Sequence, residues 1–147
     1  MHRSARSLAM IPALLMVLGA AGSATAAEEG GVSVQTAGCP GDGNFGYGSV
    51  CTSLSSGAVF HSKTVNGSGN TVITTRYKKT SGSSITAKLG YTYAGTTYWG
   101  STFTQSSGTE KTKTWTRTGD VFKCRATVGI MNVSGQGNFQ TPVSQYC

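Results

Sequence analysis

Apolar and polar residues alternate along much of this chain, and the clearest alternation lies in residues 121–131, VFKCRATVGIM. Every second residue there is apolar or small, including Cys124, whereas Lys123, Arg125 and Thr127 lie between them. A period of two is typical of a strand with one buried face and one solvated face. We therefore expect a central strand over residues 121–131 that carries Cys124 on its buried side.

Segments rich in β-branched and aromatic residues recur along the chain, and turns rich in Gly, Ser and Asn separate them. The NGSGN sequence of residues 66–70 is a strong hairpin-turn signal, and no helical 3.6-residue pattern lies between the turns. The pattern predicts an all-β fold, a small antiparallel β-sandwich or partly open barrel of about seven to eight strands. The expected strands are residues 50–54, 58–65, 71–79, 85–93, 97–105, 111–117, 121–131 and 138–143, with a further edge strand at 32–36.

The first 26 residues have the pattern of a secretory signal peptide. Arg3 and Arg6 precede an apolar run over residues 8–21, and small residues follow as Ala24-Thr25-Ala26. The run is shorter than the roughly 20 residues that a transmembrane helix needs. We expect cleavage after Ala26 and a secreted, extracellular protein with one domain over residues 27–147 and no membrane span.

Composition and cysteine count refine this picture of an exported β protein. The expected mature chain keeps ten basic and five acidic residues, a net charge of +5, and it is rich in Ser, Thr and Gly. In this composition it resembles the small exported proteins of Gram-positive bacteria with GC-rich genomes, without a motif that identifies a family.

The four cysteines all follow the expected cleavage site, and their even number predicts two disulfides that staple the sandwich. Cys39 and Cys51 flank a short Gly-rich loop, so loop length favours the pairs Cys39–Cys51 and Cys124–Cys147. Each bridge should contribute about 3 kcal/mol in the chain-entropy model. A zinc site is disfavoured, because the chain has no C-x-x-C pair and no histidine near these cysteines.

Catalytic constellations are missing from the sequence. The expected mature chain has one histidine, His61, and its acidic residues are far apart in sequence. It has no G-x-S-x-G turn, no phosphate-binding loop and no calcium loop. We expect a non-enzymatic protein with no catalytic residue, no cofactor and no metal.

Basic residues on two expected strands form the main candidate binding surface. Alternation places Lys111, Lys113, Trp115 and Arg117 on one face of their strand, and Lys123 and Arg125 on one face of the next. A short turn at residues 118–120 should make these strands hairpin neighbours, so their outer faces would merge. Such a surface would bind an anionic envelope polymer or a membrane surface, whereas specific nucleic-acid binding is not expected. The alternative is a solvated face that only protects the sheet.

Aromatic residues of one hairpin offer a second candidate surface. Tyr91, Tyr93, Tyr98 and Trp99 lie in YTYAGTTYWG, bordered by small polar residues. Exposed aromatics of this kind are typical of carbohydrate-binding and protein-binding surfaces. The alternative, favoured for Tyr91, is that they belong to the sandwich core.

Together these features predict a secreted, monomeric, non-enzymatic binding module for a cell-envelope polymer or another extracellular surface. Two alternatives stay open. One is a secreted antimicrobial, bacteriocin-like toxin that acts through its cationic face. The other is an exported protease inhibitor that presents the loop between Cys39 and Cys51.

Overall fold

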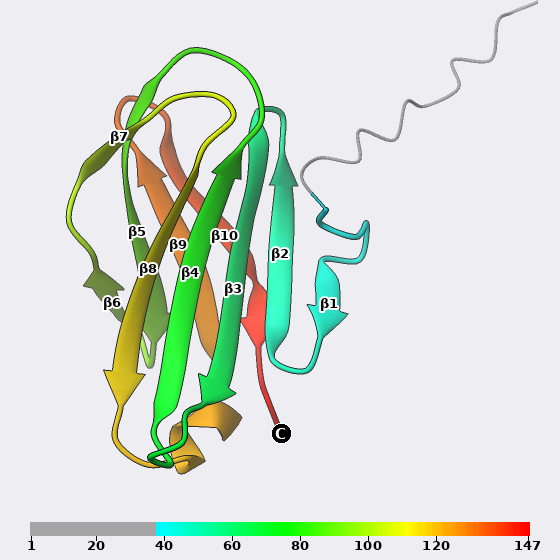
Figure 1. The fold of residues 1–147 in the computed structure, drawn as a ribbon, viewed down its shortest axis with the longest axis vertical. Helices are drawn as coiled ribbons and strands as arrows, with labels where there is room; N and C mark the ends of the chain where they lie inside the picture. Colours follow the sequence, from blue (N-terminus) through cyan, green and yellow to red (C-terminus); the bar gives the residue numbers. More distant parts are fainter. Residues whose placement is uncertain (1–37) are drawn as a thin grey trace, which may run out of the picture. The chain divides into compact units, whose positions relative to one another are not determined.

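The computed structural model describes residues 38–147, which form ten strands and one 3-10 helix in two antiparallel sheets (Figure 1). This confirms the predicted all-β sandwich with two disulfides. The expected signal peptide, its cleavage site and the expected strand at 32–36 lie outside the described residues. The elements are β1 Asn44–Gly46, β2 Ser49–Leu54, β3 Gly57–Val65, β4 Thr71–Lys79, β5 Ile85–Tyr93, β6 Thr96–Trp99, β7 Phe103–Gln105, β8 Glu110–Arg117, η1 Val121–Cys124, β9 Thr127–Val133 and β10 Gly137–Ser144.

Each sheet contains five strands. The first has the order β1-β2-β3-β4-β8, and the second has the order β10-β9-β5-β6, with β7 also paired to β5. The longest pairing joins β3 to β4 over nine residue pairs, from Gly57 opposite Lys79 to Val65 opposite Thr71. Because β4 pairs with β8 on its other side, β8 is the last strand of the first sheet within residues 38–147.

The hydrophobic core lies between the sheets and takes alternate residues from β3, β4, β5 and β9. Its buried members are Val59, Tyr77, Ala87, Leu89, Met131 and Val133. The alternation expected for residues 85–93 is confirmed, because Ala87, Leu89 and Tyr91 are all buried. Burial of each large apolar side chain stabilises the fold by about 1.5–3 kcal/mol relative to exposure.

The prediction of one strand over residues 121–131 is wrong in its first half. Residues 121–124 form η1, closed by backbone hydrogen bonds from Lys123 N to Asp120 O and from Arg125 N to Phe122 O, both 3.0 Å. The chain crosses here from β8 in the first sheet to β9 in the second, and a straight strand cannot make that crossing. The expected division of faces also fails in β9, since Thr127 and Met131 of the expected solvated side are buried, whereas Ile130 is buried as expected.

The expected strand at 97–105 is divided into β6 and β7. Gly100 N donates to Leu89 O at 2.7 Å just after β6, and a Cβ at Gly100 would lie 2.9 Å from Lys113 Cγ. The chain therefore approaches β5 and β8 too closely for the strand to continue regularly. As a result Phe103 packs against the core, whereas Trp99 covers Gly90 on the other face of the second sheet. This division and the short β1 explain why ten strands form where seven to eight were expected.

No helix among residues 38–147 is long and apolar enough to cross a membrane.

Candidate binding surface between β6 and β8

Four of the six predicted binding residues lie on β8 and share one face of that strand. Lys111, Lys113, Trp115 and Arg117 alternate with the exposed threonines of the same strand. The prediction placed this face outward, whereas the structure turns it toward the second sheet. Trp115 lies edge-on to the ring of Tyr91 on β5, with 5.0 Å between ring centroids.

Arg117, near the end of β8, contacts aromatic side chains from three other elements. Its Nε donates to Tyr91 Oη at 2.7 Å, and its guanidinium lies 4.3 Å from the ring centroid of Tyr98 on β6. The Phe122 ring of η1 lies 5.7 Å from the same guanidinium. Tyr91 and Tyr98 stack on each other with 4.9 Å between centroids. We name the β6–β8 surface by its members, Tyr91, Tyr98, Lys111, Lys113, Trp115, Arg117 and Phe122.

Arg117 has no acidic partner among the described residues. The two ion pairs within residues 38–147 join Arg76 to Glu110 and Lys123 to Asp120. A guanidinium has five N–H donors, and the contact with Tyr91 uses the one on Nε. Tyr98 also lies within hydrogen-bonding reach of this guanidinium, so the N–H groups that are not directed at Tyr91 or Tyr98 remain for an anionic ligand.

The aromatic surroundings keep this arginine charged. Burial alone would lower the pKa of Arg117, but its hydrogen bond to Tyr91 and the neighbouring Tyr98 raise that pKa above its usual value. Burial raises the pKa of the Tyr91 hydroxyl, so the tyrosine stays neutral as the hydrogen-bond acceptor. The surface thus presents a permanent cation against neutral rings, which strengthens cation–π attraction where water is partly excluded.

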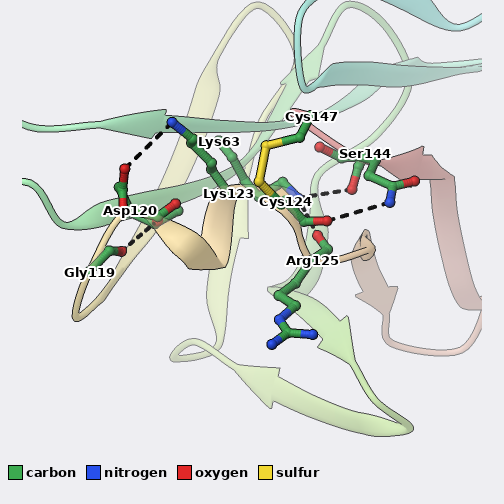
Figure 2. The surroundings of a disulfide bond; sticks show 10 residues. Lys63, Gly119, Asp120, Lys123, Cys124, Arg125, Ser144 and Cys147 are labelled. Carbon is green, nitrogen blue, oxygen red and sulfur yellow. Dashed lines mark hydrogen bonds and ion pairs between the residues drawn. A yellow bond between two sulfur atoms is a disulfide. The ribbon is translucent and has the colours of Figure 1, made fainter.

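Lys123 and Arg125 do not join the four β8 residues, and the expected hairpin between their strands does not form. Lys123 lies in η1, where its Nζ is 3.7 Å from the Asp120 carboxylate (Figure 2). Arg125 follows η1, and its backbone carbonyl accepts a hydrogen bond from Lys63 Nζ. The expectation failed because β8 pairs with β4, whereas β9 pairs with β5 and β10.

The C-terminal segment fixes η1, and with it the Phe122 ring beside Arg117. Cys124 of η1 is bonded to Cys147, and Tyr146 N donates to Lys123 O at 3.1 Å. The buried Lys63 ammonium donates to Ser144 O at 3.0 Å and to the Arg125 carbonyl, so it holds both segments (Figure 2). Burial lowers the pKa of Lys63 to about 8.

The predicted aromatic hairpin is partly core and partly surface. Tyr91 is fully buried, as expected, whereas Tyr93, Tyr98 and Trp99 are half-buried. Tyr93 lies against Phe122 with 4.8 Å between ring centroids, and Trp99 lies under Lys88 Nζ at 4.5 Å. The sequence analysis treated the basic residues and the aromatic residues as two separate candidate surfaces. Alternation in the sequence showed which residues share one face within β5 and within β8. It did not show that these two faces pack against each other.

The other predicted disulfide, Cys39–Cys51, is also present and closes the loop considered as an inhibitory segment. The loop folds back as the β1–β2 hairpin, with Phe45 packed edge-on against Phe60 at 5.5 Å. Tyr47 projects from the hairpin turn and is 83% exposed.

The single histidine of the described residues has a structural position. His61 is fully buried, with Nδ1 3.0 Å from Thr75 Oγ1 and Nε2 2.9 Å from Thr127 Oγ1. Among residues 38–147, no group of three His, Cys, Asp or Glu residues is placed to hold a metal ion.

Comparison of the chain with protein-family models, with curated proteins and with solved structures finds no match.

Proposed function

We propose that this protein is a secreted, non-enzymatic binding module whose β6–β8 surface takes an anionic polymer of a cell envelope. The observation that carries the proposal is Arg117, a half-buried cation held by Tyr91 and Tyr98 without an acidic partner among residues 38–147. A cation held in this way by rings, with free N–H groups, is suited to a phosphate or carboxylate group.

The lysines extend this site along the strand. From Lys111 to Arg117 the strand advances about 20 Å, at roughly 3.3 Å per residue. Lys111 and Lys113 are therefore roughly 7 Å apart along the strand, and Arg117 lies roughly 13 Å beyond Lys113. A row of this kind favours a ligand with repeated negative charges over one with a single charge, because each charge group adds a further contact. Trp115 lies within the row and offers a partly exposed ring face or edge to a sugar or glycerol unit.

Export is part of the proposal. The two disulfides are bonds of an oxidising compartment, which agrees with the extracellular location expected from residues 1–26. The toxin and inhibitor alternatives stay predictions, and no contact among the described residues favours either over polymer binding.

The test is a titration of the exported protein with purified teichoic acid, in which tryptophan fluorescence measures binding. Trp115 belongs to this surface, so its fluorescence reports on binding, whereas Trp99 on β6 lies on the other face of the second sheet. We expect saturable binding in low salt that weakens at physiological and higher salt, because exposed charges are screened over about 8 Å at 0.15 M ionic strength.

Charge-reversal variants locate the surface. Lys111→Glu with Lys113→Glu should weaken binding about tenfold or more, since each cation near an anionic surface contributes about 1 kcal/mol. Lys78→Glu with Arg125→Glu is the matched control, because both residues are exposed and lie outside the β6–β8 surface, and the change of net charge is the same. The proposal fails if the wild-type protein does not bind at low salt, or if the control weakens binding as much as the double variant.

A further inference from the structure

A cavity lies at the end of the sandwich opposite η1 and is lined by residues of three turns. Figure 1 shows these turns at its upper end. These turns join β2 to β3, β4 to β5, and β9 to β10. The cavity has a volume of about 210 Å³. Its floor is the end of the hydrophobic core, with Tyr77, Met131 and Val133 buried and Leu54, Ile85 and Phe139 partly exposed around them.

One charged side chain, Lys79, also lines this cavity. Lys79 is the last residue of β4 and only 2% exposed. Its Nζ donates to Ser81 O at 2.5 Å, and a Cβ at Gly82 on the cavity rim would lie 3.4 Å from Nζ. The ammonium group therefore lies near the mouth of the cavity, beside the β4–β5 turn.

The Lys79 charge has no acidic partner in the described part of the chain. Of the three acids there, Glu110 pairs with Arg76, Asp120 pairs with Lys123, and Asp42 makes no ion pair with Lys79. An ammonium group has three donors, and one is used by Ser81 O. A buried cation without a counter-ion is costly, so an anion at this position would be bound favourably.

We propose that this cavity binds the anion of a short fatty acid, with the carboxylate on Lys79 and the acyl chain on the core residues Met131 and Val133. The combination of one buried cation and an apolar floor matches a ligand that is charged at one end and apolar at the other. This site is independent of the β6–β8 surface and of the function proposed for it.

The cavity volume sets the chain length. A methylene group takes about the volume of a water molecule, roughly 30 Å³, so the cavity holds on the order of seven carbon atoms. Each methylene buried should tighten binding about fourfold. In a series from butanoate to dodecanoate, the dissociation constant should therefore fall steeply up to about octanoate and then level off.

Met131 supplies a specific reporter for this series. The other three methionines are Met1, Met10 and Met16, all within the expected signal peptide, so the exported protein should give one methionine methyl signal. We expect octanoate, below its micelle concentration, to shift the Met131 methyl resonance with one-to-one saturation. Tryptophan fluorescence should stay unchanged, because Trp99 and Trp115 do not line this cavity.

Headgroup and lysine variants test the role of charge. Octanol and octylammonium should bind at least tenfold more weakly than octanoate, because neither can pair with the ammonium of Lys79. Lys79→Met should weaken octanoate binding at least tenfold, whereas Lys78→Met, an exposed neighbour with the same change of charge, should not.

Several results would overturn the proposal: no shift of Met131 with octanoate, equal binding of octanoate and octylammonium, or equal effects of the two lysine variants. If Lys79→Met does not fold, the headgroup and chain-length series on the wild-type protein still decides the matter. If the wild-type protein binds teichoic acid but does not bind octanoate, this site is refuted and the proposed function is unaffected.

Discussion

At the scale of single residues, His61 shows how a titratable group becomes part of a core. Thr75 Oγ1 donates to Gly90 O at 2.9 Å, so it must accept from His61 Nδ1, and Nε2 then accepts from Thr127 Oγ1. This chain of hydrogen bonds needs the neutral imidazole, because protonated Nε2 cannot accept. Burial, and then the nearby charge of Lys63, lower the pKa of His61 to about 3.

The low pKa of His61 makes stability depend on pH. Between about pH 6.5 and 3 the unfolded chain binds a proton at His61 that the folded protein does not, so the free energy of unfolding falls as pH is lowered. The slope should reach about 1.4 kcal/mol per pH unit. Urea unfolding at pH 7, 6 and 5 measures it while the carboxylates remain mostly ionised.

The variant His61→Gln provides the control for this pH dependence. An amide can still bond to Thr75 and Thr127 but does not titrate, so the variant should be less stable at pH 7 and show a nearly flat profile from pH 7 to 5. A wild-type profile as flat as that of the variant would contradict the assignment of His61.

At the scale of elements, the β5–β6 hairpin carries a local strain. Its two-residue turn consists of Ala94 and Gly95, both with positive φ, 47° and 78°. Positive φ at both central residues suits the type I′ turn that fits the twist of a hairpin. Ala94 is the one non-glycine residue with positive φ among residues 38–147, and this conformation costs about 1–2 kcal/mol for a residue with a Cβ.

Replacing that alanine should therefore stabilise the protein. Ala94→Gly removes the steric cost but adds freedom to the unfolded chain, so we expect a net gain of about 0.5–1 kcal/mol in urea unfolding. Gly95→Ala is the opposite case and should destabilise the protein, because it places a second Cβ at positive φ. Equal stability of the two variants would show that the turn relaxes without strain.

Element boundaries also show what the sequence could predict. The strands at 71–79 and 85–93 were predicted with their observed bounds, because alternation is regular there and turn residues flank both. Residues 121–126 alternate just as clearly, but the disulfide from Cys124 and the bond from Lys63 to the Arg125 carbonyl hold them outside a strand. Tertiary contacts of this kind leave no local signal.

At the scale of the whole molecule, the sandwich and its disulfides could be predicted from turn spacing and loop length, whereas the candidate sites could only be predicted in parts. Lys111, Lys113, Trp115 and Arg117 were found on one strand face, but the partner of that face depends on which strands pair. The cavity at Lys79 had no signal at all, because it forms where three separate turns meet around one buried lysine.

The position of β8 at the end of its sheet has a further consequence for how copies of this protein meet. The strand is eight residues long and leaves one row of backbone groups unpaired within residues 38–147, which is a template for another strand. Lys111 and Lys113 oppose this, because antiparallel pairing of two copies would bring cations together.

A polyanion that neutralises these lysines would remove the repulsion and concentrate the chains at the same time. Light scattering during titration with teichoic acid should therefore rise to a maximum near charge balance and fall again with excess polymer or salt, while the protein alone stays monomeric. Scattering that stays at the monomer level throughout a titration with proven binding would show that the edge is protected by more than its charge. If the scattering does rise and fall with added polymer, Lys111 and Lys113 keep the copies apart by charge repulsion until the ligand neutralises them.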